Sequence, residues 1–333
     1  MGSGNRPVLV LTNPHDLTAD TVVQALDARG THVFRCDVAD FPLSLTLSAT
    51  LKEDGWAGEL HRPSRPLDLT QVRSVYYRRP GPFKLPERMS DDEHAFADLE
   101  ARAGFLGVLA SLPCRWINHP GRETEATYKP IQLAEAAAAG LRPPASIITN
   151  DPNQARNFIV SLGRPALYKG IGLYLAADPA AVPVAATRLV TENEIDDSVR
   201  LTAHLFQEFL PKAYEVRVTV VGQRMFAVEI HAGSEAALLD WRTDYDALTY
   251  RPTSVPDDIR PRIAVLMNRF GLIFGALDFV VTPESEWRFL EINPNGQWLW
   301  LAQETGLPIA EAIADQLMVP QRAMPLRYQA EPK

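Results

Sequence analysis

The sequence is poor in the features that mark several classes of protein. It has two cysteines, Cys36 and Cys114, among 333 residues, too few for a disulfide framework or a zinc site. It has no apolar run of about 18 residues, the length that a membrane span requires. Lys and Arg number 33 against 41 Asp and Glu, for a net charge of −8, so the usual basic footprint of a nucleic-acid-binding protein is missing. We therefore expect a cytoplasmic protein without a membrane or nucleic-acid partner.

What remains is the composition of an ordinary globular protein, with 46% hydrophobic and 22% charged residues. The length allows two to three domains. Residues 8–13, 16–29 and 31–37 read as strand, helix and strand, the opening of an open α/β sheet. This opening lacks a G-x-G-x-x-G sequence, so it does not predict a dinucleotide site.

Two adjacent arginines follow the next predicted strands. We expect a hairpin over residues 45–60 and a strand over 72–77, which leads directly into Arg78 and Arg79. The ends of parallel strands are where open α/β sheets bind ligands. Arg78 and Arg79 are therefore candidates for binding a substrate, and a solvated basic turn is the alternative.

A long amphipathic helix is predicted over residues 90–112, with Ser90 as its N-cap and Glu93 in the capping-box position. Its expected apolar side carries Phe96, Leu99, Ala103, Leu106 and Leu109. A strand over 114–120 follows, and we place a first domain boundary near residue 120.

The second part of the chain alternates helices and strands. We expect helices over 123–140, 152–162, 257–270 and 308–318, and strands over 165–170, 201–211, 216–222 and 225–230. Residues 170–197 read as a hairpin with a mobile loop, and residues 234–256 as irregular.

A β-hairpin over residues 277–293 carries the first sign of chemistry. Two apolar runs flank the turn-forming TPESE, with Asp278 on the first strand and Glu291 and Asn293 on the second. Residues two apart leave the same face of a strand, so Glu291 and Asn293 point together. Oxygen ligands without His or Cys suit Mg²⁺ between protein and phosphate oxygens. The alternative is a hairpin whose acidic residues face water.

Two lysines and a strand end upstream favour a nucleotide at this hairpin. Lys129 and Lys169 lie on or beside apolar elements, where a lysine needs an anionic partner. Gln207, Glu208, Phe209 and Leu210 form a strand end between two predicted lobes, which can offer main-chain groups to adenine. Further along the chain, Glu215 can bind ribose hydroxyls. Arg217, two residues after Glu215 and so on the same face of the strand, can stabilise a transferring phosphoryl group.

Taken in order, these motifs resemble the ATP-grasp superfamily over about residues 118–320: Asn118, Lys129, the YK of Lys169, QEFL at 207–210, EVR at 215–217, Asp278 and EINPNG from Glu291. Residues 1–117 resemble its companion N-terminal α/β domain. More narrowly, VYYRRP, WINHP, KAYEVRVTVVG, the DWR at 240–242 and EINPNGQW resemble the peptide-modifying ATP-grasp ligases that make graspetides, the microviridin-type ω-ester and ω-amide peptides.

The resemblance implies an α/β fold in which two α+β lobes clasp ATP behind an N-terminal open α/β domain. It implies domains at 1–120, 121–206 and 207–320, and a tail at 321–333. ATP phosphates would be bound by Lys129 and Lys169, adenine by Glu208 to Leu210 and ribose by Glu215. Two Mg²⁺ ions would be bound by Asp278, Glu291 and Asn293. A glycine-rich lid is usual in the superfamily, but residues 170–190 are only weakly glycine-rich, so the identity of the lid stays open.

The implied reaction joins Asp or Glu side-chain carboxylates of a ribosomal precursor peptide to Ser, Thr or Lys side chains through an acyl-phosphate. Arg217, Asp240 and Arg242 are the catalytic candidates, with Arg217 at the γ-phosphate and Asp240 as a base. His231 is a candidate for the substrate or for a base, or else a partner to nearby carboxylates. The alternatives are a ligase of free amino acids or small peptides and a non-catalytic ATP-binding module. A homodimer is compatible with the resemblance, but no residue specifies it.

Overall fold

The computed structural model describes residues 6–63, 65–172 and 187–319. The chain opens with a four-stranded parallel sheet in the order β2-β1-β6-β7. Its strands are β1 (Val8–Leu11), β2 (Val33–Cys36), β6 (Ser74–Tyr77) and β7 (Arg115–Ile117). Helix α1 (Leu17–Asp27) connects β1 to β2, and Asp16 caps its first turn. The predicted open α/β domain is confirmed.

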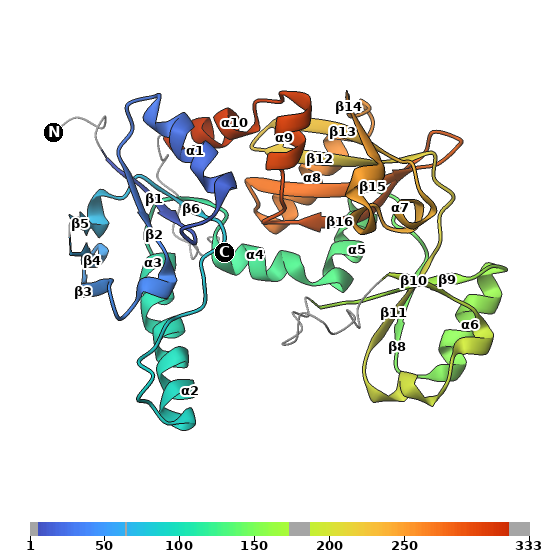
Figure 1. The fold of residues 1–333 in the computed structure, drawn as a ribbon, viewed down its shortest axis with the longest axis horizontal. Coiled ribbons are helices and arrows are strands. Elements are labelled where there is room, and N and C mark those ends of the chain that lie inside the picture. The colour runs from blue at the N-terminus through green and yellow to red at the C-terminus, as the bar shows by residue number, and fades with distance from the viewer. Residues whose placement is uncertain (1–5, 64, 173–186, 320–333) are drawn as a thin grey trace, which may run out of the picture.

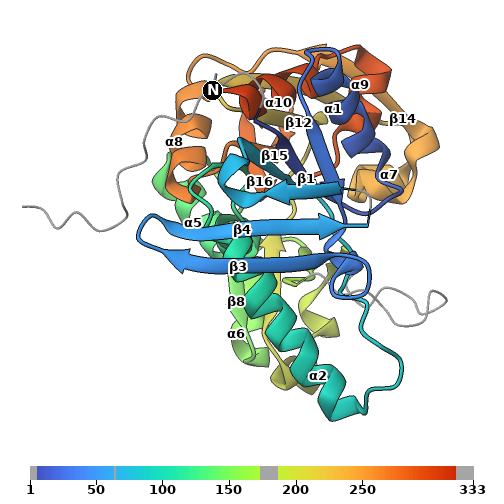
Figure 2. The ribbon, with the colours of Figure 1, turned by 90° about the vertical axis from the view of Figure 1, so that its left-hand side faces the viewer.

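A small antiparallel sheet lies beside this domain, with β3 (Thr46–Lys52), β4 (Gly55–Arg62) and β5 (Arg65–Asp68) in that order. Figure 2 shows β3 and β4 running side by side above α2. The predicted hairpin over 45–60 is confirmed, and β5 adds a third strand to it.

The helix predicted over 90–112 exposes the face that we expected to be buried. Helix α2 (Asp91–Glu100) passes into a π-helical segment (Ala101–Leu106) and then α3 (Gly107–Ala110). Phe96 and Leu99 are 65% and 62% exposed, whereas Phe105 is buried. A π-helical turn has more residues than an α-helical turn, so it changes which residues share a face with those that precede it. The predicted apolar side was therefore wrong for the first half of the helix.

The predicted helix over 123–140 is two helices, α4 (Pro120–Thr127) and α5 (Lys129–Ala138). Tyr128 between them has extended dihedral angles, with φ −73° and ψ 105°. Pro130 has no N–H to donate, so it is tolerated in a first turn but not in a helix interior. The break makes Lys129 the first residue of α5.

The central lobe is an antiparallel sheet in the order β10-β9-β11-β8, packed against α6 (Pro152–Leu162). The strands are β8 (Ser146–Thr149), β9 (Ala166–Lys169), β10 (Arg188–Val190) and β11 (His204–Glu208). Most of the segment in which we expected a hairpin, a mobile loop and the ATP lid lies outside the described residues.

The C-terminal lobe is built on a five-stranded antiparallel sheet in the order β14-β13-β12-β15-β16. The strands are β12 (Tyr214–Val221), β13 (Arg224–Ala232), β14 (Leu248–Thr253), β15 (Phe274–Val281) and β16 (Trp287–Asn293). Its helices are α7 (Glu235–Leu239), α8 (Arg260–Phe270), α9 (Leu299–Thr305) and α10 (Ile309–Met318). The region 234–256 is therefore more regular than predicted, since it contains α7 and β14.

The last helix returns to the beginning of the chain. Helix α10 packs on α1 and on the parallel sheet (Figure 1), and Ile313 and Leu317 share a buried cluster with Val8 and Val22. We keep the division at residues 120, 206 and 320 as a proposal, although β11 carries the sheet of the central lobe on to Glu208. Residues 321–333 lie outside the described part. No helix in the described part is long and apolar enough to cross a membrane.

Candidate active site

The hairpin of β15 and β16 brings Asp278 and Glu291 directly opposite each other. Arg217 on β12 is also opposite Asp278, so all three lie on one face of the sheet. A β-bulge follows Asp278, and Asn293 lies two residues beyond Glu291 and donates a hydrogen bond from its amide to Glu291 Oε1 at 3.0 Å. Glu291 and Asn293 therefore point together, as their parity predicted, and the register of the hairpin brings Asp278 opposite Glu291.

Three cationic side chains contact these two carboxylates. Arg217 binds Asp278 through two hydrogen bonds of 2.7 Å each. Arg242 contacts Asp278 at 3.1 Å and Glu291 at 2.5 Å, and Lys129 forms an ion pair with Glu291. Burial alone would raise the pKa of Glu291, but Lys129 and Arg242 outweigh it and hold that pKa well below its usual range.

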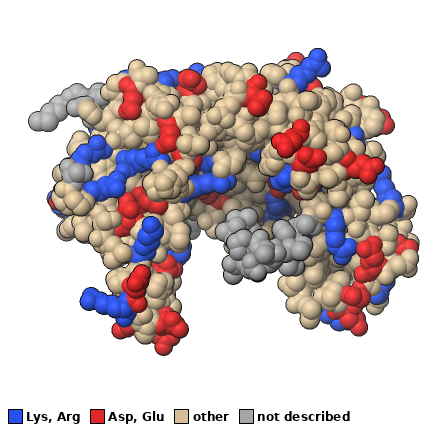
Figure 3. Space-filling view, viewed as in Figure 1, with Lys and Arg blue, Asp and Glu red and all other residues tan. Residues whose placement is uncertain are grey.

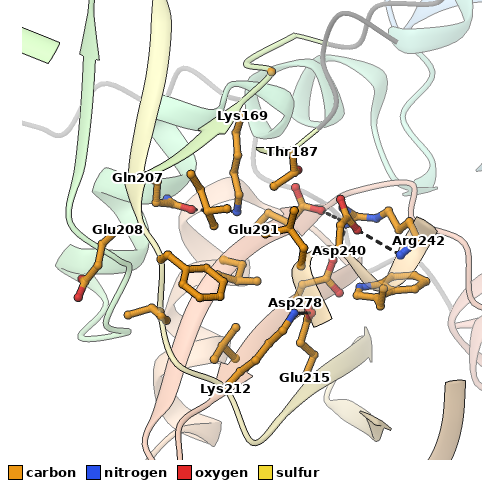
Figure 4. Close-up of a pocket in the computed structure, with 18 of the residues that line it drawn as sticks. Lys169, Thr187, Gln207, Glu208, Lys212, Glu215, Asp240, Arg242, Asp278 and Glu291 are labelled. Carbon is orange, nitrogen blue, oxygen red and sulfur yellow. Dashed lines mark hydrogen bonds and ion pairs between the residues drawn. The ribbon is translucent and has the colours of Figure 1, made fainter. Parts of the chain in front are cut away.

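Lys129, Arg242, Asp278 and Glu291 line a cavity of about 320 Å³ between the central and C-terminal lobes. Arg217 and Asn293 contact these carboxylates but do not line the cavity. Lys169, Gly170, Gln207 and Glu208 come from the central lobe, and Glu215, Asp240, Asp278 and Glu291 come from the other side (Figure 4). A cavity of this size between two lobes is typical of a small-ligand site. Figure 3 shows a wide hollow between α2 and the central lobe, with basic side chains along its upper wall.

Lys169 reaches the cavity from the end of β9. Its ammonium donates a hydrogen bond to Gln207 Oε1 at 2.9 Å, and the amide of Gln207 donates in turn to Ser146. In the described part of the chain no carboxylate forms an ion pair with Lys169. Burial lowers the pKa of Lys169, and the nearby charge of Lys129 lowers it further, against the opposing effect of Glu291. A desolvated cation of this kind is a strong site for an anionic ligand.

The strand end that we predicted to bind adenine lies at the rim of the cavity. Phe209 and Leu210 line it, but the side chain of Glu208 points away from the other labelled residues (Figure 4). Its carboxylate is bound by Arg164 at 2.8 Å and lies 3.6 Å from Arg288. Any contact of Glu208 with a ligand in the cavity is therefore left to its main chain.

Glu215 and Lys212 form a buried ion pair in the same cavity. Burial raises the pKa of Glu215, although the charge of Lys212 opposes the shift. We did not single out Lys212 from the sequence. Its position three residues before Glu215 was the available signal.

The indole ring of Trp241 lies against the guanidinium groups of Arg217 and Arg242. Its ring lies 5.1 Å from the guanidinium carbons of both Arg217 and Arg242, a distance at which cations are attracted to an indole. Trp300 packs against Trp241, with 5.3 Å between the two ring centroids. Asp240 caps the short helix that carries Arg242 and lines the cavity. From the sequence, Trp241 was noted only as part of the DWR motif at residues 240–242.

Two predicted substrate-binding residues lie elsewhere. Arg78 is 2% exposed, and its guanidinium bonds Asn295 and, at 2.5 Å, Gln297 Oε1. It is therefore not accessible to a substrate, whereas Arg79 is exposed. His231 lies on β13 three residues from Val228, the neighbour of Arg217, and so projects from the opposite face of the sheet. It contacts Glu229 at 2.9 Å, the carboxylate partnership that we gave as the alternative.

The candidate metal site offers oxygen donors from two carboxylates and one amide. Among the described residues, no group of three or more His, Cys, Asp or Glu is arranged to hold a metal ion. Asp278, Glu291 and Asn293 instead supply two carboxylates and an amide. This all-oxygen set fits Mg²⁺, which commonly completes its shell with water and with phosphate oxygens of a substrate.

Comparisons with known proteins agree with this geometry. The family described as MvdD pre-ATP grasp domain matches residues 7–124. A RiPP-associated ATP-grasp ligase from Chryseobacterium gregarium, solved with ADP and a leader and core peptide, is 31% identical, with a TM-score of 0.87 over 94% of this chain and 96% of that one. The macrocyclase MdnB from Microcystis aeruginosa is 30% identical, with a TM-score of 0.78 over 94% and 99%.

The macrocyclase MdnC from the same organism, bound to its precursor peptide MdnA, is 29% identical, with a TM-score of 0.82 over 93% of this chain and 99% of that one. A comparison with curated protein sequences gave no match. The two relatives at 30% identity or more are matched over almost their full length. The chain therefore belongs to the RiPP-associated ATP-grasp ligases, the graspetide-type family that its motifs resemble.

Proposed function

We propose that this ATP-grasp ligase activates Asp or Glu side-chain carboxylates of a ribosomal precursor peptide and joins them to Ser, Thr or Lys side chains. The observation that carries the proposal is one cavity between two lobes, in which the desolvated Lys169 faces the carboxylates Asp278 and Glu291. A cation without an acidic partner beside a pair of oxygen ligands suits a nucleotide phosphate with Mg²⁺.

ATP would lie along the cavity from the lobe junction to the hairpin. Main-chain groups of Glu208 to Leu210 would bind adenine, and Glu215 would bind ribose. Gln207 lines the cavity next to the adenine-binding residues. Lys169 and Lys129 would bind phosphate oxygens. For Lys129 this requires exchanging its present partner, Glu291, for phosphate or sharing its donors between the two.

Asp278, Glu291 and Asn293 would bind Mg²⁺, which supplies charge neutralisation for the in-line transfer of a phosphoryl group. Arg242 already contacts both carboxylates, so we expect its guanidinium to turn toward the phosphates or the substrate when the nucleotide binds. Arg217 remains fixed on Asp278 by two hydrogen bonds.

The reaction then has two steps. A carboxylate oxygen of the peptide attacks the γ-phosphorus and the bond to ADP breaks, which gives an acyl-phosphate and ADP. A hydroxyl or amine attacks the activated carbonyl, phosphate leaves, and an ester or amide forms. Asp240 at the cavity wall is the candidate acceptor for the proton that the attacking group loses.

The peptide substrate is proposed from the relatives. The Chryseobacterium ligase was solved with a leader and a core peptide, and MdnC with its precursor MdnA. Arg79, exposed at the end of β6, is our remaining candidate for peptide contact. We place the enzyme in the cytoplasm, where ribosomal peptides and ATP are both present.

The test measures ADP release with Mg²⁺-ATP, alone and with candidate precursor peptides, together with the intact mass of each peptide. We expect ADP release that depends on peptide and a loss of about 18 Da, one water, for each bond formed. Lys169→Met should abolish both, and Lys52→Met, at an exposed lysine of β3, should change neither.

Two results would contradict the proposal. ADP release with free amino acids and without a peptide would identify a small-molecule ligase. Tight ATP binding without turnover under every condition would identify a binding module.

A further inference from the structure

Gln132 is a buried polar residue that lies outside the cavity but next to its acidic wall. It is 1% exposed and lies on α5, three residues after Lys129 and so one helical turn further on. Helix α5 packs against β16 (Figure 1), the strand that carries Glu291 and Asn293. No role was assigned to Gln132 from the sequence.

The amide of Gln132 uses all of its donors in this position. Its Nε2 donates to Ala126 O at 2.6 Å and to Ile292 O at 2.9 Å, and its Oε1 accepts from the N–H of Ile292 at 3.1 Å. An amide has two N–H donors and one carbonyl acceptor. An ionised glutamate would lose both donors and keep only the acceptor for the Ile292 N–H, and an apolar side chain of equal length would lose every hydrogen bond.

Ile292 lies between the two candidate metal ligands of β16. Because β16 is the edge strand of its sheet, both main-chain groups of Ile292 need a partner other than β15. Gln132 provides that partner, as a neighbouring strand would do. The side chain of Ile292 is fully buried on the other face, in a cluster with Leu277 and Phe289. The backbone between Glu291 and Asn293 is therefore held from both sides.

We propose that Gln132 is a positioning residue, which fixes the spacing and direction of Glu291 and Asn293 for binding Mg²⁺ with the nucleotide. The same helix turn directs Lys129 at Glu291, so α5 sets both the metal ligands and a phosphate-binding lysine relative to each other. The inference rests on the proposed function in one respect, that Glu291 and Asn293 are metal ligands.

The test uses Mn²⁺ as the probe, measured by calorimetry and electron paramagnetic resonance on the full chain with ADP. Gln132→Met removes all three hydrogen bonds at nearly constant length. We expect it to weaken Mn²⁺ binding by about 10- to 100-fold, the usual effect of losing a group that orients metal ligands. The half-saturating Mg²⁺ concentration for ADP release should rise in proportion, with a smaller change in KM for peptide. Gln154→Met, at an exposed glutamine of α6, is the matched control.

Glu291→Gln serves as the reference that separates the two hypotheses. If Glu291→Gln binds Mn²⁺ like the wild type, the metal assignment itself is wrong. The inference is overturned by a different pair of results. In that case Glu291→Gln loses Mn²⁺ binding, whereas Gln132→Met unfolds at a lower temperature but keeps its Mn²⁺ affinity within about twofold. Gln132 would then be only structural. Should Gln132→Met give no folded protein, Gln132→Glu, which retains the acceptor for the Ile292 N–H, is measured against the same criteria.

Discussion

Lys169 shows how a site residue can be unfavourable for the folded state. Its ammonium lies in the cavity with the neutral amide of Gln207 as its hydrogen-bond partner, and burial lowers its pKa. A cation held in this way lowers the free energy of unfolding of the free protein, and binding of an anionic ligand raises it again. The consequences for affinity and for stability can be measured separately.

Replacing Lys169 by methionine should weaken nucleotide binding and stabilise the free protein. We expect a loss of about 100-fold or more in ADP formation, because a preorganised charge at the phosphates is removed. The melting temperature without nucleotide should rise, since a partly buried cation whose pKa is lowered is gone. Calorimetric ATP binding and thermal unfolding test both effects, with Lys52→Met as the exposed control. Unchanged ATP affinity would show that Lys169 does not contact phosphate.

The same lysine predicts the sign of a pH effect. Between the lowered pKa of Lys169 and its ordinary value of 10.5, the unfolded chain binds the proton and the folded chain has lost it. Stability contributed by this group therefore rises with pH in that window. Urea unfolding of the wild type and Lys169→Met at about pH 7 and about pH 10 should show the mutant's advantage shrinking as pH rises. An advantage that is constant or grows would contradict the lowered pKa.

At the scale of elements, α2 and the helical segment after it show a regular apolar spacing that did not predict the buried face. The spacing of Phe96, Leu99, Ala103 and Leu106 is regular, yet Phe96 and Leu99 are exposed. The side that packs on the domain core runs through Ala101, Phe105 and Leu109. The π-helical segment separates the two halves, and no residue type in the sequence marks its place.

This difference gives a stability test within one helix. Phe96→Gln and Leu99→Gln should change the free energy of unfolding by no more than about 0.5 kcal/mol, as surface substitutions do. Phe105→Ala should cost about 3–5 kcal/mol, because it leaves a cavity beside Phe41 and Phe83. Urea unfolding measures all three. A large loss for Phe96→Gln would mean that this face is covered in solution.

The sequence predicted elements with a strong local pattern and missed those that depend on partners. The hairpin of Asp278 and Glu291 followed from two apolar runs and a turn, whereas the register that pairs these two residues came from the structure. The position of His231 required the pairing of β13 with β12, which no local pattern contains. Similarly, the sequence suggested that Arg78 binds a ligand. It could not show that the partners of this side chain lie in a loop more than 200 positions away.

At the scale of the whole molecule, Arg78 forms a polar contact between two domains. Arg78, at the end of β6 in the N-terminal domain, bonds Asn295 and Gln297 in the loop after β16. The main-chain carbonyl of Gln297 accepts a hydrogen bond from Arg217 at 3.1 Å, and Arg217 holds Asp278. The N-terminal domain is thus connected through this loop to the acidic wall of the cavity.

Replacing Arg78 by methionine should loosen that connection. The substitution removes the donor to the Asn295 carbonyl and one of the two donors to Gln297 Oε1, which also accepts from Thr18, at a cost of about 1–3 kcal/mol. Hydrogen exchange over residues 294–298 should accelerate, and ADP formation should fall even though Arg78 does not line the cavity. Arg79→Met, one position further on and exposed, should leave this exchange unchanged. Equal effects of the two substitutions would indicate a general disturbance of the turn.

The return of α10 to the parallel sheet bears on how such enzymes can be recombined. Ile309, Ile313 and Leu317 of α10 complete an apolar cluster whose other members include residues of β1 and α1. A fragment cut after residue 120 would present that half of the cluster to water, so it is not a self-sufficient building block. Chimeras between relatives should therefore exchange the N-terminal domain and α10 together, because these two stretches, distant in sequence, form one packed structural unit.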